Sequence, residues 1–171
     1  MIELIQDYWL YFLIGQYPNG PLGGLVLTLL LASCGLVLAL PLGIVLGLAR
    51  VSPWRSLRWP VSGFVFVVRG LPLLMVIFWA YFFLPSVTGV KTDQFATMLI
   101  ALVVFDAAYL AEIVRAGIQG LPRGQMETAR ALGLSWSRAM RLVVLPQALR
   151  SMLPSLVNQF VSTIKETSLG Y

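Results

Sequence analysis

The stretch "GGLVLTLLLASCGLVLALPLGIVLGLA", residues 23–49, runs for 27 residues without a charged side chain. A helix that crosses a bilayer needs about 20 predominantly apolar residues, so this stretch predicts a membrane-spanning helix. The rest of the sequence agrees, because 58% of its 171 residues are hydrophobic and 11% are charged. A soluble domain is about half apolar and about a quarter charged. We therefore expect an all-α fold, a multi-pass transmembrane helical bundle.

Three further stretches are long enough to cross a bilayer: residues 61–85, 95–118 and 151–171. The first of these is interrupted by Arg69, the second carries Asp106 near its centre, and the third is the most polar. Pro41 and Pro72 lie inside predicted spans, where neighbouring helices satisfy the carbonyls that proline leaves free. We predict four spans, with a kink at each of these two prolines.

Basic residues cluster after the first and third spans. They are Arg50, Arg55 and Arg58, then Arg123, Arg130, Arg138, Arg141 and Arg150. Because positive charge marks cytoplasmic loops, we place residues 50–60 and 119–150 in the cytoplasm, and the N-terminus and 86–94 outside. The sequence then divides into an outer interfacial segment, 1–20, and a transmembrane domain, 21–171. The predicted location is a bacterial cytoplasmic (inner) membrane.

The composition also excludes several function classes. The formal net charge is +5, but the basic residues separate apolar runs and form no continuous face, so we expect contact with membrane lipid and not with nucleic acid. The sequence has no histidine and one cysteine, Cys34, which leaves no disulfide and no metal-ligand cluster. It contains no Gly-x-x-x-x-Gly-Lys-Ser/Thr phosphate loop and no nucleophile–base pair. We predict no catalytic residue, no metal and no cofactor bound by this chain.

One segment interrupts the apolar character: "GQMETARALGLSWSRAMRLVVLPQ", residues 124–147. Glycine and proline at positions 120, 122 and 124 should end the third span. A short helix is then predicted from Gln125 to Leu132, with Gly133 as its left-handed cap. Ser135 is placed to cap a second helix, which we expect to run through Leu145 and to stop at Pro146.

Two interpretations of this helix–turn–helix remain open from the residues alone. It resembles an amphipathic helix that rests on anionic lipid headgroups. It would equally serve as a docking surface for another protein, because Ala129 and Ala131 keep the first helix narrow. In that case Arg130, Arg138 and Arg141 would supply charge and Trp136 an anchor.

The segment "ETARALGLSWSRAMRLVVLP" is similar to the EAA loop of permease subunits of ABC importers. That motif reads Glu-Ala-Ala, three residues, Gly, nine residues, then Ile-x-Leu-Pro. Six positions match or nearly match at the motif's spacing: Glu127, Ala129, Gly133, Val143, Leu145 and Pro146. Thr128 replaces the first alanine and Val143 the isoleucine. The resemblance implies that residues 125–146 couple this chain to a partner ATPase, with Arg130 and Ala131 in the same contact.

Three more stretches resemble the polar amino-acid branch of these importers: "VVRGLPLLM" at 67–75, "AEIVRAGIQGLPRGQMETARALG" at 111–133 and "KETSL" at 165–169. The resemblance implies a second permease subunit, two ATPase subunits that bind ATP and Mg²⁺, and an external solute-binding protein. The family usually continues for one more span, so we expect this chain to lack a final C-terminal span.

Ionisable groups inside a membrane are costly, about 2.5–3.5 kcal/mol each on insertion scales, and are candidate functional residues. Asp106, Tyr109 and Glu112 follow one another at three-residue steps on the third span. Ser155, Gln159, Ser162 and Glu166 form one polar stripe on the last helix. If the two stripes face each other, they line a polar path for an amino acid, whose ammonium group would be bound by the carboxylates.

The substrate's own carboxylate would then need Arg69, Arg115, Lys165 or the N-terminus of a broken helix. A structural alternative stays open: Asp106 and Glu112 would pair with Arg115 or would hold helices together, and Lys165 with Glu166 would be an end-of-helix pair near the outer surface. Arg115 also fits a side chain that reaches toward the inner membrane face. Relatives that carry arginine tend to have an acid where this chain has Gln159, so the resemblance favours glutamate, aspartate or glutamine as substrate.

We therefore predict a permease subunit of an ATP-driven, binding-protein-dependent importer of polar amino acids, which is not itself an enzyme. The alternative from another class is a secondary transporter, or a fragment of one, driven by an ion gradient through Asp106 and Glu166. An intramembrane hydrolase is a third hypothesis. It would need a pair of aspartates, and only Asp106 lies at membrane depth.

Overall fold

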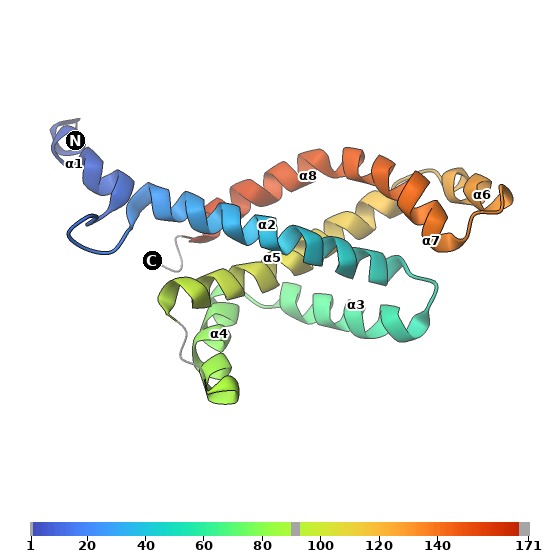
Figure 1. The fold of residues 1–171 in the computed structure, drawn as a ribbon, viewed down its shortest axis with the longest axis horizontal. Coiled ribbons are helices and arrows are strands. Elements are labelled where there is room, and N and C mark those ends of the chain that lie inside the picture. Colours follow the sequence, from blue (N-terminus) through green and yellow to red (C-terminus); the bar gives the residue numbers. More distant parts are fainter. Residues whose placement is uncertain (1, 90–92, 168–171) are drawn as a thin grey trace.

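A computed structural model describes residues 2–89 and 93–167, whose regular secondary structure is helical. The chain runs from one end of an elongated bundle to the other several times (Figure 1). In order, the elements are α1 (Ile2–Ile14), α2 (Gly24–Val51), α3 (Arg55–Gly70), α4 (Leu73–Thr88), α5 (Gln94–Gln119), α6 (Gly124–Ala131), α7 (Trp136–Ala139), a π-helical turn (Met140–Val144) and α8 (Leu145–Glu166).

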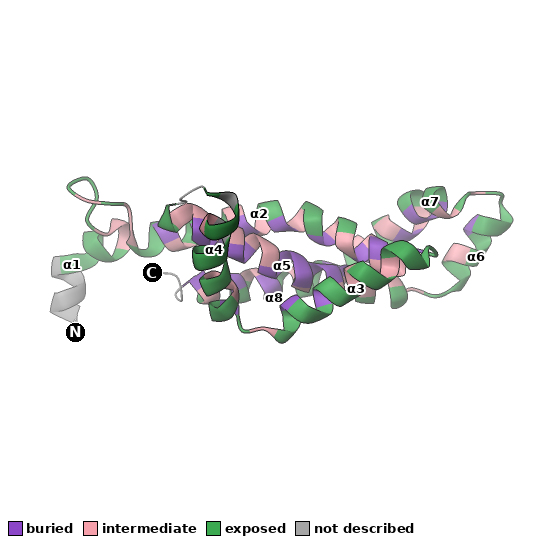
Figure 2. Cartoon of the chain, turned by 90° about the horizontal axis from the view of Figure 1, so that it is seen from below, coloured by how far each residue is buried: buried purple, intermediate pink, exposed green. Residues whose placement is uncertain are grey.

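Helix α5 is the centre of the bundle and packs against α2, α3, α4 and α8. Figure 2 shows the buried residues concentrated along it. The main core forms where α2, α3 and α5 meet, around Leu31, Val65 and Leu102, all 0% exposed. A helix that is apolar on all sides and buried on most of them is typical of the interior of a membrane bundle.

The contact between α2 and α5 is very close because α2 presents a small residue at every fourth position. These residues are Gly35, Ala39, Gly43 and Gly47. A Cβ atom added at Gly43 would lie 2.5 Å from the Leu110 Cβ, and one added at Gly47 would lie 2.6 Å from the Val114 Cβ. Small residues at this spacing let two membrane helices approach backbone to backbone.

The stretch 61–85, predicted as one span with a kink at Pro72, is divided at that proline into two helices. Helices α3 and α4 meet at an angle of 107° across Leu71 and Pro72. Both residues are extended, with ψ values of 142° and 143°. The cause is local, because a residue that precedes proline is disfavoured in the helical region. Pro41, in contrast, lies inside the uninterrupted helix α2.

Two helices, α2 and α5, are long and apolar enough to cross a membrane by length and composition, and α3 with α4 would make a third if the bent pair counts as one span. Helix α8 has 22 residues and lies beside α5 and α2 (Figure 1), but it contains too many polar residues to be a candidate span by composition.

The outward faces of the bundle are strongly apolar. Phe66 is 80% exposed, Val37 69%, and the α4 side chains Trp79 and Phe82 are 63% and 66% exposed. Large aromatic and aliphatic side chains exposed over whole helices would be unfavourable in water. They suit a protein whose solvent is the hydrocarbon core of a bilayer.

We predict that Gly47→Ala destabilises the bundle by about 1–3 kcal/mol, the usual range for overpacking. The added methyl group would meet the Val114 side chain at 2.6 Å and the Ala111 carbonyl oxygen at 3.0 Å, so α2 and α5 must separate. Thermal unfolding of the detergent-solubilised protein measures this change.

Gly63→Ala is the matched control, because nothing lies within 4 Å of a Cβ atom at Gly63 in α3. Alanine is favoured over glycine in a helix by about 0.5–1 kcal/mol, so this variant should be as stable as the parent or slightly more so. Equal unfolding temperatures for the two variants would contradict the proposed α2–α5 contact.

Candidate translocation site and coupling segment

A fully buried carboxylate lies at the centre of the bundle. Asp106 of α5 is 0% exposed. The Gln159 amide donates to its Oδ1 at 2.8 Å, and the Thr163 hydroxyl lies 3.0 Å from either carboxylate oxygen. These bonds join α5 to α8 and provide polar partners for a group that would be costly to leave alone in a membrane. Asp106 therefore does not pair with Arg115, but it does hold two helices together, which was the other option of the structural alternative.

A second carboxylate, Glu112, lies further along α5. Its oxygens form ion pairs with Arg50 of α2 and Arg115 of α5, and lie 3.5 Å from Nη1 of Arg69 of α3. Arg69 also lies over the Tyr109 ring, 5.2 Å from its centroid. Three guanidinium groups from three helices thus surround one carboxylate, which leaves this cluster with a net positive charge.

The two polar stripes predicted from the sequence do meet, but only in part. Tyr109 and Glu112 of α5 line a cavity of about 350 Å³ together with Arg69 of α3 and Ser155 and Gln159 of α8. Pockets that hold small molecules begin at about 300 Å³, so the volume suits a ligand of amino-acid size. Asp106 lies behind this cavity and reaches it through Gln159.

The far end of the α8 stripe differs from the prediction. Ser162 is exposed and does not line the cavity. Its neighbour Thr163 is 0% exposed and bonds to Asp106. The signal was available, because a four-residue step from Gln159 leads to Thr163 on the same helix face. Glu166 is partly buried, and its Oε2 has no hydrogen-bond partner among residues 2–89 and 93–167.

The segment that follows α5 has the predicted local structure at its start. Helix α6 ends at Ala131, and Gly133 adopts the left-handed conformation with φ +83°. Ser135 caps the next helix by accepting from the Arg138 amide. The turn between them is closed by the Gly133 amide, which donates to the Arg130 carbonyl at 3.0 Å. Helices α6 and α7 lie together at one end of the bundle (Figure 1).

Two expectations about this segment are wrong. Pro146 does not stop the second helix, because it lies in the first turn of α8, where no amide donor is needed, and the helical path continues through the π-helical turn Met140–Val144. Ala129 is 3% exposed, so it packs within the chain and offers no surface to a partner. Glu127, Arg130, Ala131 and Gly133 are exposed, Pro146 is exposed, and Leu145 is partly buried.

Comparison with characterised proteins finds permeases of similar sequence. The chain is 38% identical over 161 residues to a probable glutamine ABC transporter permease protein, GlnP, of Bacillus subtilis, covering 92% of this chain and 73% of that protein. It is 40% identical over 172 residues to the glutamate/glutamine/aspartate/asparagine transport system permease protein BztC of Rhodobacter capsulatus, covering 98% of this chain and 39% of BztC. The chain thus spans less than half of one relative and about three quarters of the other.

The fold has a counterpart among solved structures. The crystal structure of an amino acid ABC transporter with histidines superposes with a TM-score of 0.80 at 31% sequence identity, covering 99% of this chain and 74% of that one. The likeness therefore extends over α1 to α8, including the broken pair α3–α4 and the polar helix α8.

Residues 39–171 match the family model of the binding-protein-dependent transport system inner membrane component. This match begins inside α2 and includes every residue of the Asp106 and Glu112 clusters, together with the whole α6–α7 segment. The chain belongs to this family of membrane transport components, which are not themselves enzymes.

Proposed function

We propose that this chain is the membrane-spanning subunit of an ATP-driven importer of polar amino acids, and that the cavity between α3, α5 and α8 is a station on the substrate's path. The observation that carries the proposal is this polar cavity inside an otherwise apolar bundle. An importer needs such a place, because a zwitterion cannot enter hydrocarbon without polar partners.

The charges around the cavity favour substrates with a carboxylate or amide side chain. Glu112 is outnumbered by Arg50, Arg69 and Arg115, so the local field disfavours a second positive charge on the substrate. Arg69 is the most exposed of the three partners, with 38% of its side chain accessible. It is the guanidinium placed to form a paired hydrogen bond with a substrate carboxylate. Glutamate, aspartate and glutamine fit this environment, and the names of GlnP and BztC agree.

The proposed binding set on α5 is Asp106, Tyr109 and Glu112. On α8 it is Gln159, and Thr163 supports the set through its bonds to Asp106. Gln159 would contact the substrate directly, and Asp106 would act through its hydrogen bond with Gln159. Glu166 would act further along α8, where its buried Oε2 has no partner in the described part of the chain. Ser162 faces outward and would act only at a contact with a second permease subunit.

The proposed contact with the ATPase is the exposed surface of α6 and the turn after it. Glu127, Arg130, Ala131 and Gly133 lie on that surface. At the start of α6, the Gln125 amide oxygen accepts a hydrogen bond from Gln147 of α8 at 3.1 Å. This bond and the continuous helical path into α8 link the docking surface to the helix that carries Gln159. Movement of a docked ATPase would therefore reach the cavity.

The proposed assembly contains two permease subunits, two ATPase subunits that hold ATP and Mg²⁺, and an external solute-binding protein. The arginine-rich end of the bundle would face the cytoplasm of a bacterial cell by the positive-inside rule, with the N-terminus outside. This chain would bind no cofactor of its own.

Transport by the complete complex in proteoliposomes tests the proposal. Import should require ATP hydrolysis and should continue when ionophores remove the proton and sodium gradients. Import without ATP that stops when a gradient collapses would overturn the proposal, and would favour the gradient-driven alternative through Asp106 and Glu166.

We predict that Gly133→Val lowers import at least about tenfold while membrane insertion is unchanged. A left-handed conformation costs most residues about 1–2 kcal/mol, and a β-branched residue more, so the turn at φ +83° would open and misplace α6. Import and co-purification of the ATPase with the permease are the measurements.

Two variants serve as controls for this experiment. Gly133→Asn should retain most activity, because asparagine tolerates the left-handed region. Gly124→Ala adds a methyl group where nothing lies within 4 Å and should have little effect. Normal import by Gly133→Val would argue against a docking role for this turn.

We predict that Arg69→Gln lowers the maximal import rate of glutamate relative to glutamine about tenfold, or ~1.4 kcal/mol. The variant removes the guanidinium from the cavity but keeps an unbranched, polar and uncharged side chain. Arg55→Gln, an exposed arginine at the start of the same helix, is the control. Rates measured with saturating binding protein isolate the membrane step, and an equal loss for both substrates would contradict the role of Arg69 in selectivity.

A further inference from the structure

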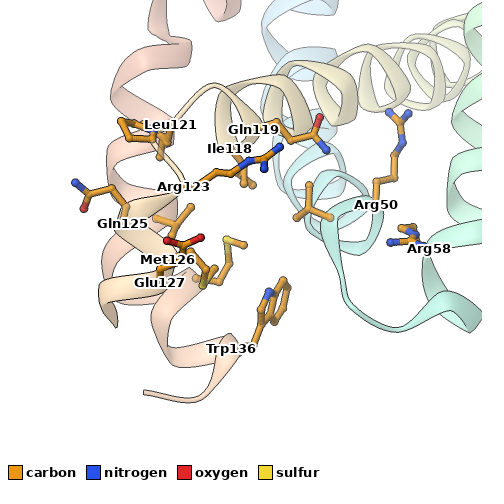
Figure 3. Close-up of a pocket in the computed structure, with 14 residues that line it drawn as sticks. Arg50, Arg58, Ile118, Gln119, Leu121, Arg123, Gln125, Met126, Glu127 and Trp136 are labelled. Atoms are coloured by element: carbon orange, nitrogen blue, oxygen red, sulfur yellow. The ribbon is translucent and has the colours of Figure 1, made fainter. Parts of the chain in front are cut away.

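A larger cavity, of about 700 Å³, lies at the other polar site of the molecule, between the α2–α3 turn and the α6–α7 segment. Figure 3 shows Arg50 and Arg58 on one side of it, Arg123, Met126 and Glu127 on the other, and Trp136 at its edge. The cavity shares Arg50 with the Glu112 cluster and Glu127 with the proposed ATPase contact, but neither of those proposals assigns it a ligand.

The cavity contains more positive charge than the protein neutralises. Its charged lining residues are three arginines and one acid: Arg50, Arg58, Arg123 and Glu127. Arg58 is half-buried and forms no ion pair with any residue in 2–89 or 93–167. Arg50 forms an ion pair with Glu112 through Nη1, but its Nε is buried and has no hydrogen-bond partner in the described part of the chain. A partly desolvated guanidinium with no counter-ion is unfavourable, so the arrangement calls for an anion.

Most of the remaining lining is apolar and includes Val51, Ile118, Leu121, Met126, Met140 and Val144, with Gln119 and Gln125 as its uncharged polar residues. A free phosphate needs no such wall, whereas a lipid does, because its acyl chains begin directly below the charged headgroup. The ligand that matches both halves of this cavity combines a phosphate anion with hydrocarbon.

The position of the cavity agrees with a lipid. Val51 is the last residue of α2, and Gln119 the last of α5, so the cavity lies where the two clearest candidate spans end. Span ends lie at the depth of the lipid headgroups. Trp54 and Trp136, whose ring centroids are 6.4 Å apart, add the aromatic side chains that favour this interface. Basic pockets between helices on the cytoplasmic side are suited to anionic headgroups.

We infer that this cavity binds one anionic phospholipid of the inner leaflet, with its phosphate between Arg58 and Arg123. The lipid would join the start of α3 to the loop before α6. The inference goes beyond the proposed transport function and does not depend on it, because binding is measured on this chain without substrate or ATP.

Native mass spectrometry of the full chain tests the inference, with phosphatidylglycerol and phosphatidylcholine of identical acyl chains as probes. We expect the parent to retain phosphatidylglycerol more strongly than phosphatidylcholine. The double variant Arg58→Gln/Arg123→Gln should bind phosphatidylglycerol about tenfold or more weakly. Equal retention of the two lipids by the parent, or unchanged binding by the double variant, would overturn the inference.

Three controls distinguish binding in this cavity from attraction to the basic surface around it. Arg138→Gln/Arg141→Gln removes two exposed arginines of the same segment that do not line the cavity, and should leave binding unchanged; an equal loss would indicate general surface attraction instead. Arg58→Lys/Arg123→Lys keeps the charge and should keep the lipid, and its loss from a monodisperse protein would contradict the electrostatic basis. Inorganic phosphate should not displace the lipid; complete displacement would indicate a site for a free anion.

Discussion

The close approach of α2 and α5 is the contact on which the rest of this structure depends. Two apolar helices gain little from association in a bilayer, because lipid tails are as apolar as leucine. Dispersion contacts therefore have to supply the attraction, and these fall steeply with distance. The glycines at 43 and 47 bring the α2 backbone against Leu110 and Val114 of α5. This contact makes α5 the central helix, and every polar residue of the candidate site lies on α5 or on a helix packed against it.

With α5 at the centre, its polar residues have to be satisfied inside the protein. Asp106 finds Gln159 and Thr163 on α8, and Glu112 finds arginines on α2, α3 and its own helix. The same pairing joins α8, too polar to be identified as a span by composition, to the apolar helix α5, because two of its polar side chains, Gln159 and Thr163, are buried against Asp106. The cavity adjoins both clusters, because Glu112 and Gln159 both line it.

Local signals in the sequence predicted local structure well. The left-handed glycine at 133 and the Ser135 cap are decided by neighbouring residues, and both are present in the structure. Features that depend on distant contacts were not predicted. Pro146 was expected to end a helix, but it lies in the first turn of α8, directly after the π-helical turn Met140–Val144. Ala129 was assigned to an outer surface, although it is buried against its own chain.

The sequence by itself determined that this is an apolar, helical membrane protein with one charged segment, residues 124–147. Composition, the length of apolar runs and capping residues are enough for this, because each acts within a few turns of one helix. Only the tertiary structure decided which polar residues share a site. Ser162 and Thr163 are neighbours in the chain, but the rotation of α8 against α5 turns one outward and buries the other against Asp106. That rotation is set by packing across the whole helix interface, and no short window of residues contains it.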